Sequence, residues 1–502
     1  MMHSHRQTPR HPGPRTRAEA TDGRETSTLA DVERFLSDLA ATGAPMVREN
    51  LGRSAGGRAL PLVVVGRPVP SGGDEAHRQG RLVVYVQANI HGGEVEGKEA
   101  VLALLRDLVQ SDPRRLLERM VLVVVPVFNG DGNEALGDVR RTRPHQDGPA
   151  LAGERPNGQG LDLNRDAVKA EAPETRAVLE RVMARWDPDL IVDLHTTNGT
   201  RHRFQHTYAP PTHPNTHPAV LEWSRDHLLG TVRRRLLRER GWNCFDYGNA
   251  EWRDGRRVWA TFGEEGRYVT NYAGLRGSAA VLSEAVSFLP FGFRIETTRA
   301  FLETVLEEAA RDADRLRAAR VAAAEDRPRE LGVRFAMHTV GEQVVPLEDP
   351  ARAGSDPSKA PTHWVDVRMP VFDRWRTVRS ARVPRQWWIP REHAAVARLL
   401  LRHGVAVERA EPGPPRRVEK FRIAEQARGG VFQGHRLIRL EGRFEEAREA
   451  PPAGGFLVPS DQPALRLAFH LLEPEGLDGA GAWNLLGDSL DPGTWFPVFK
   501  VF

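Results

Sequence analysis

Apolar segments alternate with segments of helical periodicity between residues 82 and 239, and this alternation leaves the chain few possible folds. The segments read as strand, helix, strand, helix, strand and helix over 82–90, 95–110, 120–128, 173–186, 189–194 and 218–239. Such alternation is typical of an α/β sheet with helices on both faces. We predict a doubly wound, mostly parallel mixed sheet, extended by short strands at 257–262 and 279–284 and closed by a long helix over 296–325.

The segments around this alternation divide the chain into three parts. Residues 1–26 are mostly Arg, His, Pro and polar residues, which predicts a disordered leader before a helix over 28–41. The composition changes after residue 328, because the remainder holds six of the eleven tryptophans and several short β-type runs. We expect a main domain over 27–328 and a smaller β-rich domain over 329–502.

The charge balance and the single cysteine exclude several classes of protein. The 71 Lys and Arg residues nearly cancel 67 Asp and Glu residues, and no basic stretch is interleaved with aromatic residues, so nucleic-acid binding is not expected. Cys244 is the only cysteine, which excludes an internal disulfide and cysteine-rich zinc modules. No apolar run approaches the roughly 18 residues of a membrane span, and no signal peptide is visible. We therefore expect a cytoplasmic protein without membrane partners.

A metal site is indicated where two of the predicted strands end. His91 and Glu94 follow the strand over 82–90, on the turn that opens the next helix, and His195 follows the strand over 189–194. Active sites on such sheets lie at the carboxyl ends of the strands, so these three side chains can converge. Two histidines and a carboxylate, with a fourth position open to water, are a frequent ligand set of catalytic zinc. We expect one Zn²⁺ per chain.

Glu284 is the only charged residue in the apolar run over 279–286. An ionised group in a buried strand is costly unless it is paired or lies near a metal. Glu284 is therefore a candidate functional carboxylate, and the alternative is an exposed carboxylate at the end of a strand.

Four motifs together resemble the zinc metallocarboxypeptidase family of the carboxypeptidase A type. They are His-x-x-Glu at 91–94, the segment 155–166, Asp-Leu-His at 193–195 and Leu-Ser-Glu at 282–284. The resemblance implies that 27–328 is a catalytic domain in which His91, Glu94 and His195 bind zinc. It also implies that Glu284 is the general base, which takes a proton from the attacking water and passes it to the departing amine.

The resemblance assigns two further residues to the surroundings of the metal. Arg155 would polarise the scissile carbonyl and stabilise the oxyanion, although Arg140, Arg141 and Arg143 lie in the same long loop. Asp162 would hold a zinc-bound imidazole, that of His91, from its outer side.

The resemblance also assigns residues to the substrate. Asn164 and Arg165 would bind its terminal carboxylate, because a guanidinium makes two parallel hydrogen bonds to a carboxylate. The family has a tyrosine before the base glutamate, and Tyr268 and Tyr272 both qualify here. We favour Tyr272, and Arg276 is a candidate for an additional carboxylate contact.

Three functions are consistent with this residue set. The leading hypothesis is a zinc-dependent metallocarboxypeptidase that removes a C-terminal amino acid from a peptide. The second is a zinc deacylase of N-acyl amino acids, as in the aspartoacylase and succinylglutamate desuccinylase branch, where a similar carboxylate site binds a small substrate. The third is a binding protein that has kept the fold and lost turnover, although none of the predicted ligand or base positions is substituted.

Overall fold

An eight-stranded mixed sheet forms the centre of the computed structural model, which describes residues 13–487 and 490–502. Four neighbouring pairs of strands are parallel and three are antiparallel. The predicted mixed α/β sheet is therefore confirmed. In spatial order the strands are β1 (Met46–Arg53), β2 (Ala59–Val65), β4 (Met120–Val125), β3 (Leu82–Ala88), β7 (Leu190–Thr197), β12 (Ala279–Val286), β8 (His206–Ala209) and β9 (Cys244–Asp246).

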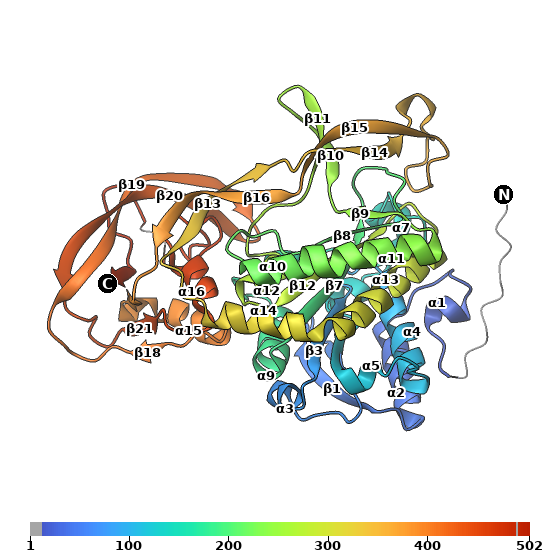
Figure 1. Cartoon of the computed structure of the whole chain (residues 1–502), viewed down its shortest axis with the longest axis horizontal. Helices are drawn as coiled ribbons and strands as arrows, with labels where there is room; N and C mark the ends of the chain where they lie inside the picture. Colours follow the sequence, from blue (N-terminus) through green and yellow to red (C-terminus); the bar gives the residue numbers. More distant parts are fainter. Residues whose placement is uncertain (1–12, 488–489) are drawn as a thin grey trace.

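Helices cover both faces of this sheet, as the alternation predicted (Figure 1). Alternate residues of each strand enter two different hydrophobic cores. One core joins the sheet to α2 (Leu29–Ala41), α4 (Glu96–Gln110), α11 (Gly230–Arg240), α13 (Phe291–Arg311) and α14 (Ala313–Glu325). The second core lies on the opposite face and joins it to α8 (Pro173–Val178), α9 (Ala184–Trp186), α12 (Val269–Leu275) and the C-terminal region.

The three central strands β3, β7 and β12 are buried along their whole lengths. Polar side chains nevertheless occur on the face that belongs to the second core, at Gln87, Asp193, His195 and Glu284. Because buried polar groups require partners, this concentration at the carboxyl ends of neighbouring strands marks the place where a site is built.

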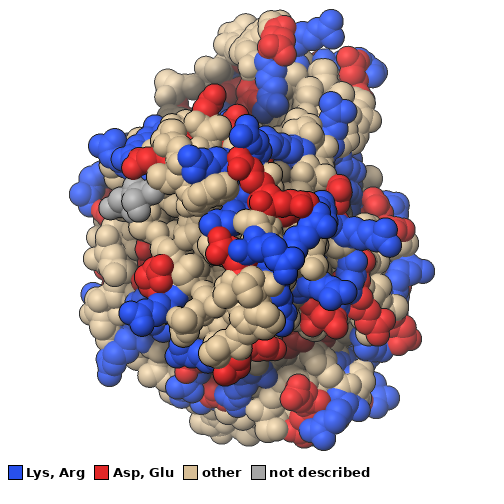
Figure 2. Space-filling view, turned by 90° about the vertical axis from the view of Figure 1, so that its left-hand side faces the viewer, with Lys and Arg blue, Asp and Glu red and all other residues tan. Residues whose placement is uncertain are grey.

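The C-terminal region is β-rich, as predicted, and its largest sheet lies to the left of the main sheet in Figure 1. Its largest sheet has six strands, and acidic and basic side chains are interspersed on the outer face (Figure 2). The strands of this sheet are β18 (Glu408–Arg409), β21 (Phe456–Pro459), β17 (Gln386–Ile389), β22 (Phe499–Val501), β19 (Arg416–Phe432) and β20 (His435–Glu449). A separate two-stranded sheet pairs β13 (Glu330–His338) with β16 (Arg374–Arg382).

One predicted strand joins a different sheet from the one expected. β11 (Arg256–Ala260) does not extend the main sheet but pairs with β10 (Asn249–Arg253) and, in parallel, with β15 (Trp364–Phe372), which also pairs with β14 (Glu342–Glu348). Strands from both sides of residue 328 therefore share one sheet. The second hydrophobic core is likewise continuous across this position, since it contains both Tyr272 and Trp387.

The expectation of a disordered leader over 1–26 is wrong from Gly13 onward, while residues 1–12 lie outside the described part. Helix α1 (Arg17–Ala20) begins with a capping box, and its Glu19 carboxylate accepts hydrogen bonds from Arg106 at 2.7 and 3.0 Å. The hydroxyl of Ser27 donates to buried Glu99 at 3.0 Å. The leader is ordered because buried charges on α4 need these partners. No helix in the described ranges has the length and apolar composition needed to cross a bilayer.

Candidate metal centre and active site

The loop after β3 fixes His91 and Glu94 through its own backbone. Asn89 adopts a left-handed conformation with φ of 59°, and its amide Nδ2 donates to the carbonyls of His91, Gly92 and Glu94 at 3.0–3.2 Å. A Cβ atom at Gly92 would lie 2.1 Å from the backbone of Gly132, so glycine is required where the two loops meet. The turn is therefore held tightly before any ligand binds.

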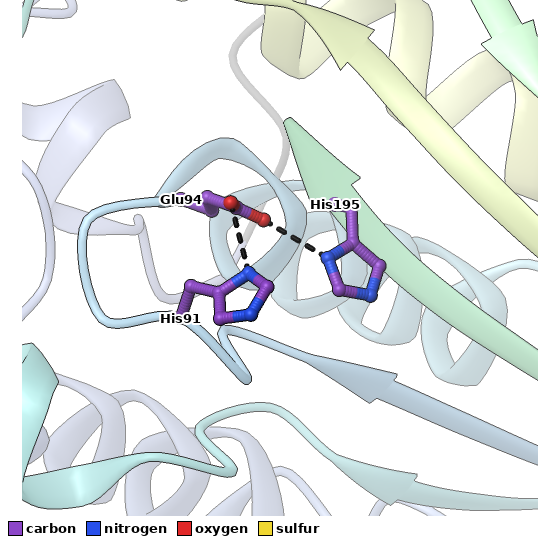
Figure 3. A group of neighbouring side chains, drawn as sticks. All are labelled: His91, Glu94 and His195. Carbon is purple, nitrogen blue, oxygen red and sulfur yellow. Dashed lines mark hydrogen bonds and ion pairs between the residues drawn. The ribbon is translucent and has the colours of Figure 1, made fainter. Parts of the chain in front are cut away.

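The structure brings His91, Glu94 and His195 together at the carboxyl ends of β3 and β7 (Figure 3). The Nδ1 atom of His91 lies 2.9 Å from Glu94 Oε1, and the Nδ1 atom of His195 lies 3.0 Å from Glu94 Oε2. The ring centres of the two histidines are 5.1 Å apart. All three side chains are at most 4% exposed. One nitrogen from each ring and a carboxylate oxygen thus converge on a common point.

Two aspartates hold the outer nitrogens of the two histidines. The Nε2 atom of His91 lies 3.0 Å from Asp162 Oδ1, and that of His195 lies 2.7 Å from Asp193 Oδ2. A carboxylate behind each imidazole fixes the tautomer with its proton on Nε2 and leaves the Nδ1 lone pair for a metal. Together with Glu94, this donor set fits Zn²⁺ with one coordination position open.

The ligand cluster is polarised by neighbouring charges. Burial alone would raise the pKa of Glu94, but the charges of His91 and Arg143 and the hydrogen bonds from both histidines hold that pKa well below its usual value. Burial likewise opposes protonation of His195, whereas Asp193 and Glu94 raise its pKa well above the usual value, so a metal that binds Nδ1 would have to displace a proton there. Glu94 is therefore ionised, which is the state in which a carboxylate can bind a metal.

Glu284 lies directly beside His195, because the two residues are paired in the register of the parallel strands β12 and β7. Its Oε2 atom is buried and has no hydrogen-bond partner among the described residues. Burial raises the pKa of Glu284 to about 8. The charge of His195 opposes this shift, and the negative charge of Glu94 adds to it. A buried carboxyl group with a perturbed pKa beside His91, Glu94 and His195 is a candidate for proton transfer.

Two arginines reach the ligand cluster from the loop that precedes Asp162. Arg155 donates to Asp162 Oδ2 from Nε and Nη2 at 2.9 and 2.7 Å, and its Nη1 lies 3.6 Å from Glu94 Oε1. Arg143 donates from Nη1 to Glu94 Oε1 at 3.2 Å and from Nη2 to the carbonyl of Thr196 at 3.0 Å. The Arg155 side chain is 41% exposed and that of Arg143 only 7%. Arg155 is thus the more accessible cation for a substrate.

Asn164 and Arg165 lie on the same short segment as Asp162, next to the start of α12. The side-chain oxygen of Asn164 accepts a hydrogen bond from the Val269 N–H at 3.2 Å. The guanidinium of Arg165 lies over the ring of Tyr268, 4.7 Å from its centre, and 3.9 Å from Asp162 Oδ2. The predicted carboxylate-binding pair is therefore linked to the metal cluster through Asp162.

Tyr272 and Arg276, the other two predicted substrate-binding residues, both contact His403. The Tyr272 hydroxyl is buried and lies 2.9 Å from His403 Nδ1, while Arg276 donates to the His403 carbonyl. Helix α12 begins at the carboxyl edge of the sheet and leads to the amino end of β12, so each turn moves its residues further from Glu284. Tyr268, directly before the helix, is the tyrosine beside the predicted carboxylate-binding pair.

Sequence reasoning assigned no role to two residues that belong to this site. Asp193 could have been found from its position two residues before a histidine on one face of an apolar strand. Tyr247 follows β9 and had no signal in the sequence. Burial, followed by the negative charges of Glu284 and Glu94, raises the pKa of Tyr247, which places its phenol within the field of the cluster.

Comparisons with known proteins find similarity to zinc carboxypeptidases. Residues 32–227 match the family model Peptidase_M14, zinc carboxypeptidase. Carboxypeptidase 2 of Trichophyton rubrum is 22% identical over 498 residues, which cover 94% of this chain and 86% of that protein. Carboxypeptidase D of Homo sapiens is 30% identical over 189 residues, which cover 30% of this chain and 13% of that protein. A metallo-carboxypeptidase structure from Pseudomonas aeruginosa, in complex with (2-guanidinoethylmercapto)succinic acid, is 23% identical with a TM-score of 0.42 and covers 58% of this chain and 70% of that one.

Residues 32–227 thus match the zinc carboxypeptidase family that the motifs indicated, and the matched segment contains His91, Glu94 and His195. The class of enzyme is thus a metallocarboxypeptidase. The deacylase hypothesis is not favoured, since the matching relatives named above are carboxypeptidases.

Proposed function

We propose that this protein hydrolyses the C-terminal peptide bond of peptides, with one zinc ion held by His91, Glu94 and His195. The observation that carries the proposal is the convergence of these ligands beside the unpartnered carboxylate of Glu284. When bound there, zinc acts as a Lewis acid that polarises a carbonyl and lowers the pKa of water.

Side chains of the protein would carry out proton transfer, stabilise the developing charge and bind the substrate. Glu284 accepts the proton of the attacking water and delivers it to the amine nitrogen as the carbon–nitrogen bond breaks and a carbon–oxygen bond forms. Arg155 offers a half-exposed guanidinium to the negative charge that develops on the carbonyl oxygen. Asn164 and Arg165 hold the free carboxylate of the substrate, which selects a chain end over an internal bond.

A substrate panel tests this proposal. It contains N-blocked dipeptides, longer peptides, the same peptides with a C-terminal amide, and N-acyl amino acids. We expect release of the last amino acid from the free peptides and about 10- to 150-fold slower hydrolysis of the amides, because a charged hydrogen-bonded contact is worth about 1.5–3 kcal/mol. Hydrolysis of the N-acyl amino acids alone would overturn the proposal in favour of the deacylase.

Metal analysis completes the test. We expect about one zinc per chain, and loss of both the metal and hydrolysis in His195→Ala. Stoichiometric zinc without hydrolysis of any substrate in the panel would favour a binding protein instead.

A further inference from the structure

The hairpin of β19 and β20 brings the C-terminal region into contact with the active-site segment. Its strands are joined by the two-residue turn Gln433–Gly434, between the paired residues Phe432 and His435. At the tip of this hairpin, the side-chain oxygen Oε1 of Gln433 accepts a hydrogen bond of 2.8 Å from the backbone N–H of Asp162. A residue 271 positions further along the chain thus touches the backbone of the aspartate behind His91.

Contacts around the tip hold the hairpin in this position. His435 Nε2 lies 2.8 Å from Glu171 Oε1, on the segment that continues from Asp162. The guanidinium of Arg267, just before α12, lies 5.2 Å from the ring centre of Phe432. The hairpin tip is therefore fixed against both segments that carry substrate-binding candidates.

The turn itself indicates why glutamine stands at position 433. Both turn residues have positive φ, 52° at Gln433 and 81° at Gly434, as in a type I′ turn. Asn, Asp or Gly is usual at the first of these positions because other side chains are strained there. Glutamine adopts a strained conformation at this position, but its side chain is longer than that of Asn or Asp and reaches the N–H of Asp162.

Asp162 is the point at which several active-site contacts meet. Its carboxylate holds Nε2 of His91 through Oδ1 and receives two hydrogen bonds from Arg155 at Oδ2. A rotation of its backbone would therefore displace a predicted metal ligand and the predicted oxyanion-binding cation together.

We propose that Gln433 is a positioning residue of the metal centre. By accepting the Asp162 N–H, it fixes the carboxylate that orients His91 and Arg155, so the C-terminal region completes the active site. This inference rests on the proposed function, because it takes His91 to be a zinc ligand.

The test compares two glutamine variants of the same hairpin in the full-length enzyme. Gln433→Leu removes the acceptor while keeping an unbranched Cβ and a similar volume. Gln426→Leu is the matched control, because the side chain of Gln426 hydrogen-bonds to Leu490 and Arg428 of the C-terminal region and, among the described residues, to none of the active-site segment. Zinc affinity is measured on the metal-free proteins by competition with a chelator, and kcat and KM are measured on a blocked dipeptide.

We expect Gln433→Leu to weaken zinc binding about 3- to 10-fold and to lower kcat by a similar factor, with KM within twofold of wild type. Gln426→Leu should leave zinc affinity within twofold. Gln433→Glu keeps an acceptor at the same reach and should retain zinc affinity. Equal zinc affinity in the two leucine variants, or a loss in Gln433→Glu equal to that in Gln433→Leu, would overturn the inference.

The wild-type enzyme separates this failure from failure of the proposed function. If wild type binds zinc and hydrolyses peptides while Gln433→Leu does both equally well, only the role of Gln433 is wrong. If wild type binds no zinc at this site, the proposed function itself fails, and the inference that rests on it fails too.

Discussion

Replacing Asp193 by asparagine should weaken zinc binding without disturbing the fold. The Asp193 side chain is 1% exposed, and its Oδ2 lies 2.7 Å from His195 Nε2. Its other oxygen accepts a hydrogen bond from Gln87 Nε2 at 2.9 Å, and Gln87 in turn accepts one from the Tyr85 hydroxyl at 2.9 Å. The two carboxylate oxygens of Asp193 therefore contact two different partners, His195 and Gln87, within a chain of buried hydrogen bonds.

Asparagine has one acceptor oxygen where aspartate has two. In Asp193→Asn either His195 or Gln87 would face an N–H group, and a flip of Gln87 would break its bond with Tyr85. Loss of a carboxylate behind a metal-binding imidazole costs about 10- to 100-fold in metal affinity, or about 1.4–2.8 kcal/mol. We expect a loss in this range, measured by chelator competition on the metal-free protein.

Asp189→Asn is the matched control for this experiment. Asp189 precedes β7 at its opposite end, about 20 Å from His195 at 3.3 Å per strand residue. It is also buried and lies 3.1 Å from the Nε2 atom of a histidine, His77. Its replacement should lower stability and leave zinc affinity unchanged. If Asp193→Asn binds zinc as tightly as Asp189→Asn, the assignment of Asp193 as the partner of a ligand is refuted.

Five further substitutions test other parts of the protein. Glu284→Gln should retain zinc, because Glu284 is not a ligand, and should lower kcat about 10²- to 10⁴-fold in peptide hydrolysis. Arg165→Ala should lower kcat/KM about 10- to 100-fold on a free peptide and much less on the corresponding C-terminal amide. Tyr272→Phe should cost about 1 kcal/mol of unfolding free energy in urea and leave KM within twofold, whereas Tyr268→Ala should raise KM. Burial, followed by the charge of Glu265, raises the pKa of Glu264 to about 7. Between about pH 4.3 and 7 the unfolded state has released this proton while the folded state keeps it, so the free energy of unfolding of the wild type falls as the pH rises. From pH 4 to 8, Glu264→Gln should therefore gain up to about 3 kcal/mol of unfolding free energy relative to wild type.

Each of these has a contradicting result. Normal turnover in Glu284→Gln would show that another group is the base, and an equal effect of Arg165→Ala on free and amidated peptides would remove Arg165 from carboxylate binding. A raised KM in Tyr272→Phe would show that Tyr272 takes part in substrate binding. A pH-independent difference between Glu264→Gln and wild type would mean that Glu264 is ionised in the folded protein across this range.

Local patterns were sufficient to predict the main sheet and the convergence of three potential metal ligands. The apolar runs of β3, β7 and β12 are buried on both faces, so their composition alone identifies them. His91, Glu94 and His195 follow or end such strands, and the carboxyl ends of parallel strands meet at one edge. Their convergence thus depends only on strand order and direction.

The remaining features depend on contacts that no local pattern contains. Choosing between Tyr268 and Tyr272 required the direction in which α12 crosses the sheet. The hydrogen bond between Asp193 and Gln87 required the register of β3 and β7. To predict that the leader is ordered would have required its contact with Arg106, which lies 87 residues after its partner Glu19.

The pairing of β11 with β15 has a consequence for any attempt to divide this protein. A fragment that stops at residue 328 would leave the edge of β11 without its neighbour, at Trp259 and Ala260, which pair with Val371 and Phe372. An open strand edge next to newly uncovered apolar surface is a template for self-association. Chimeras that exchange the C-terminal part must therefore carry a compatible substitute for β15.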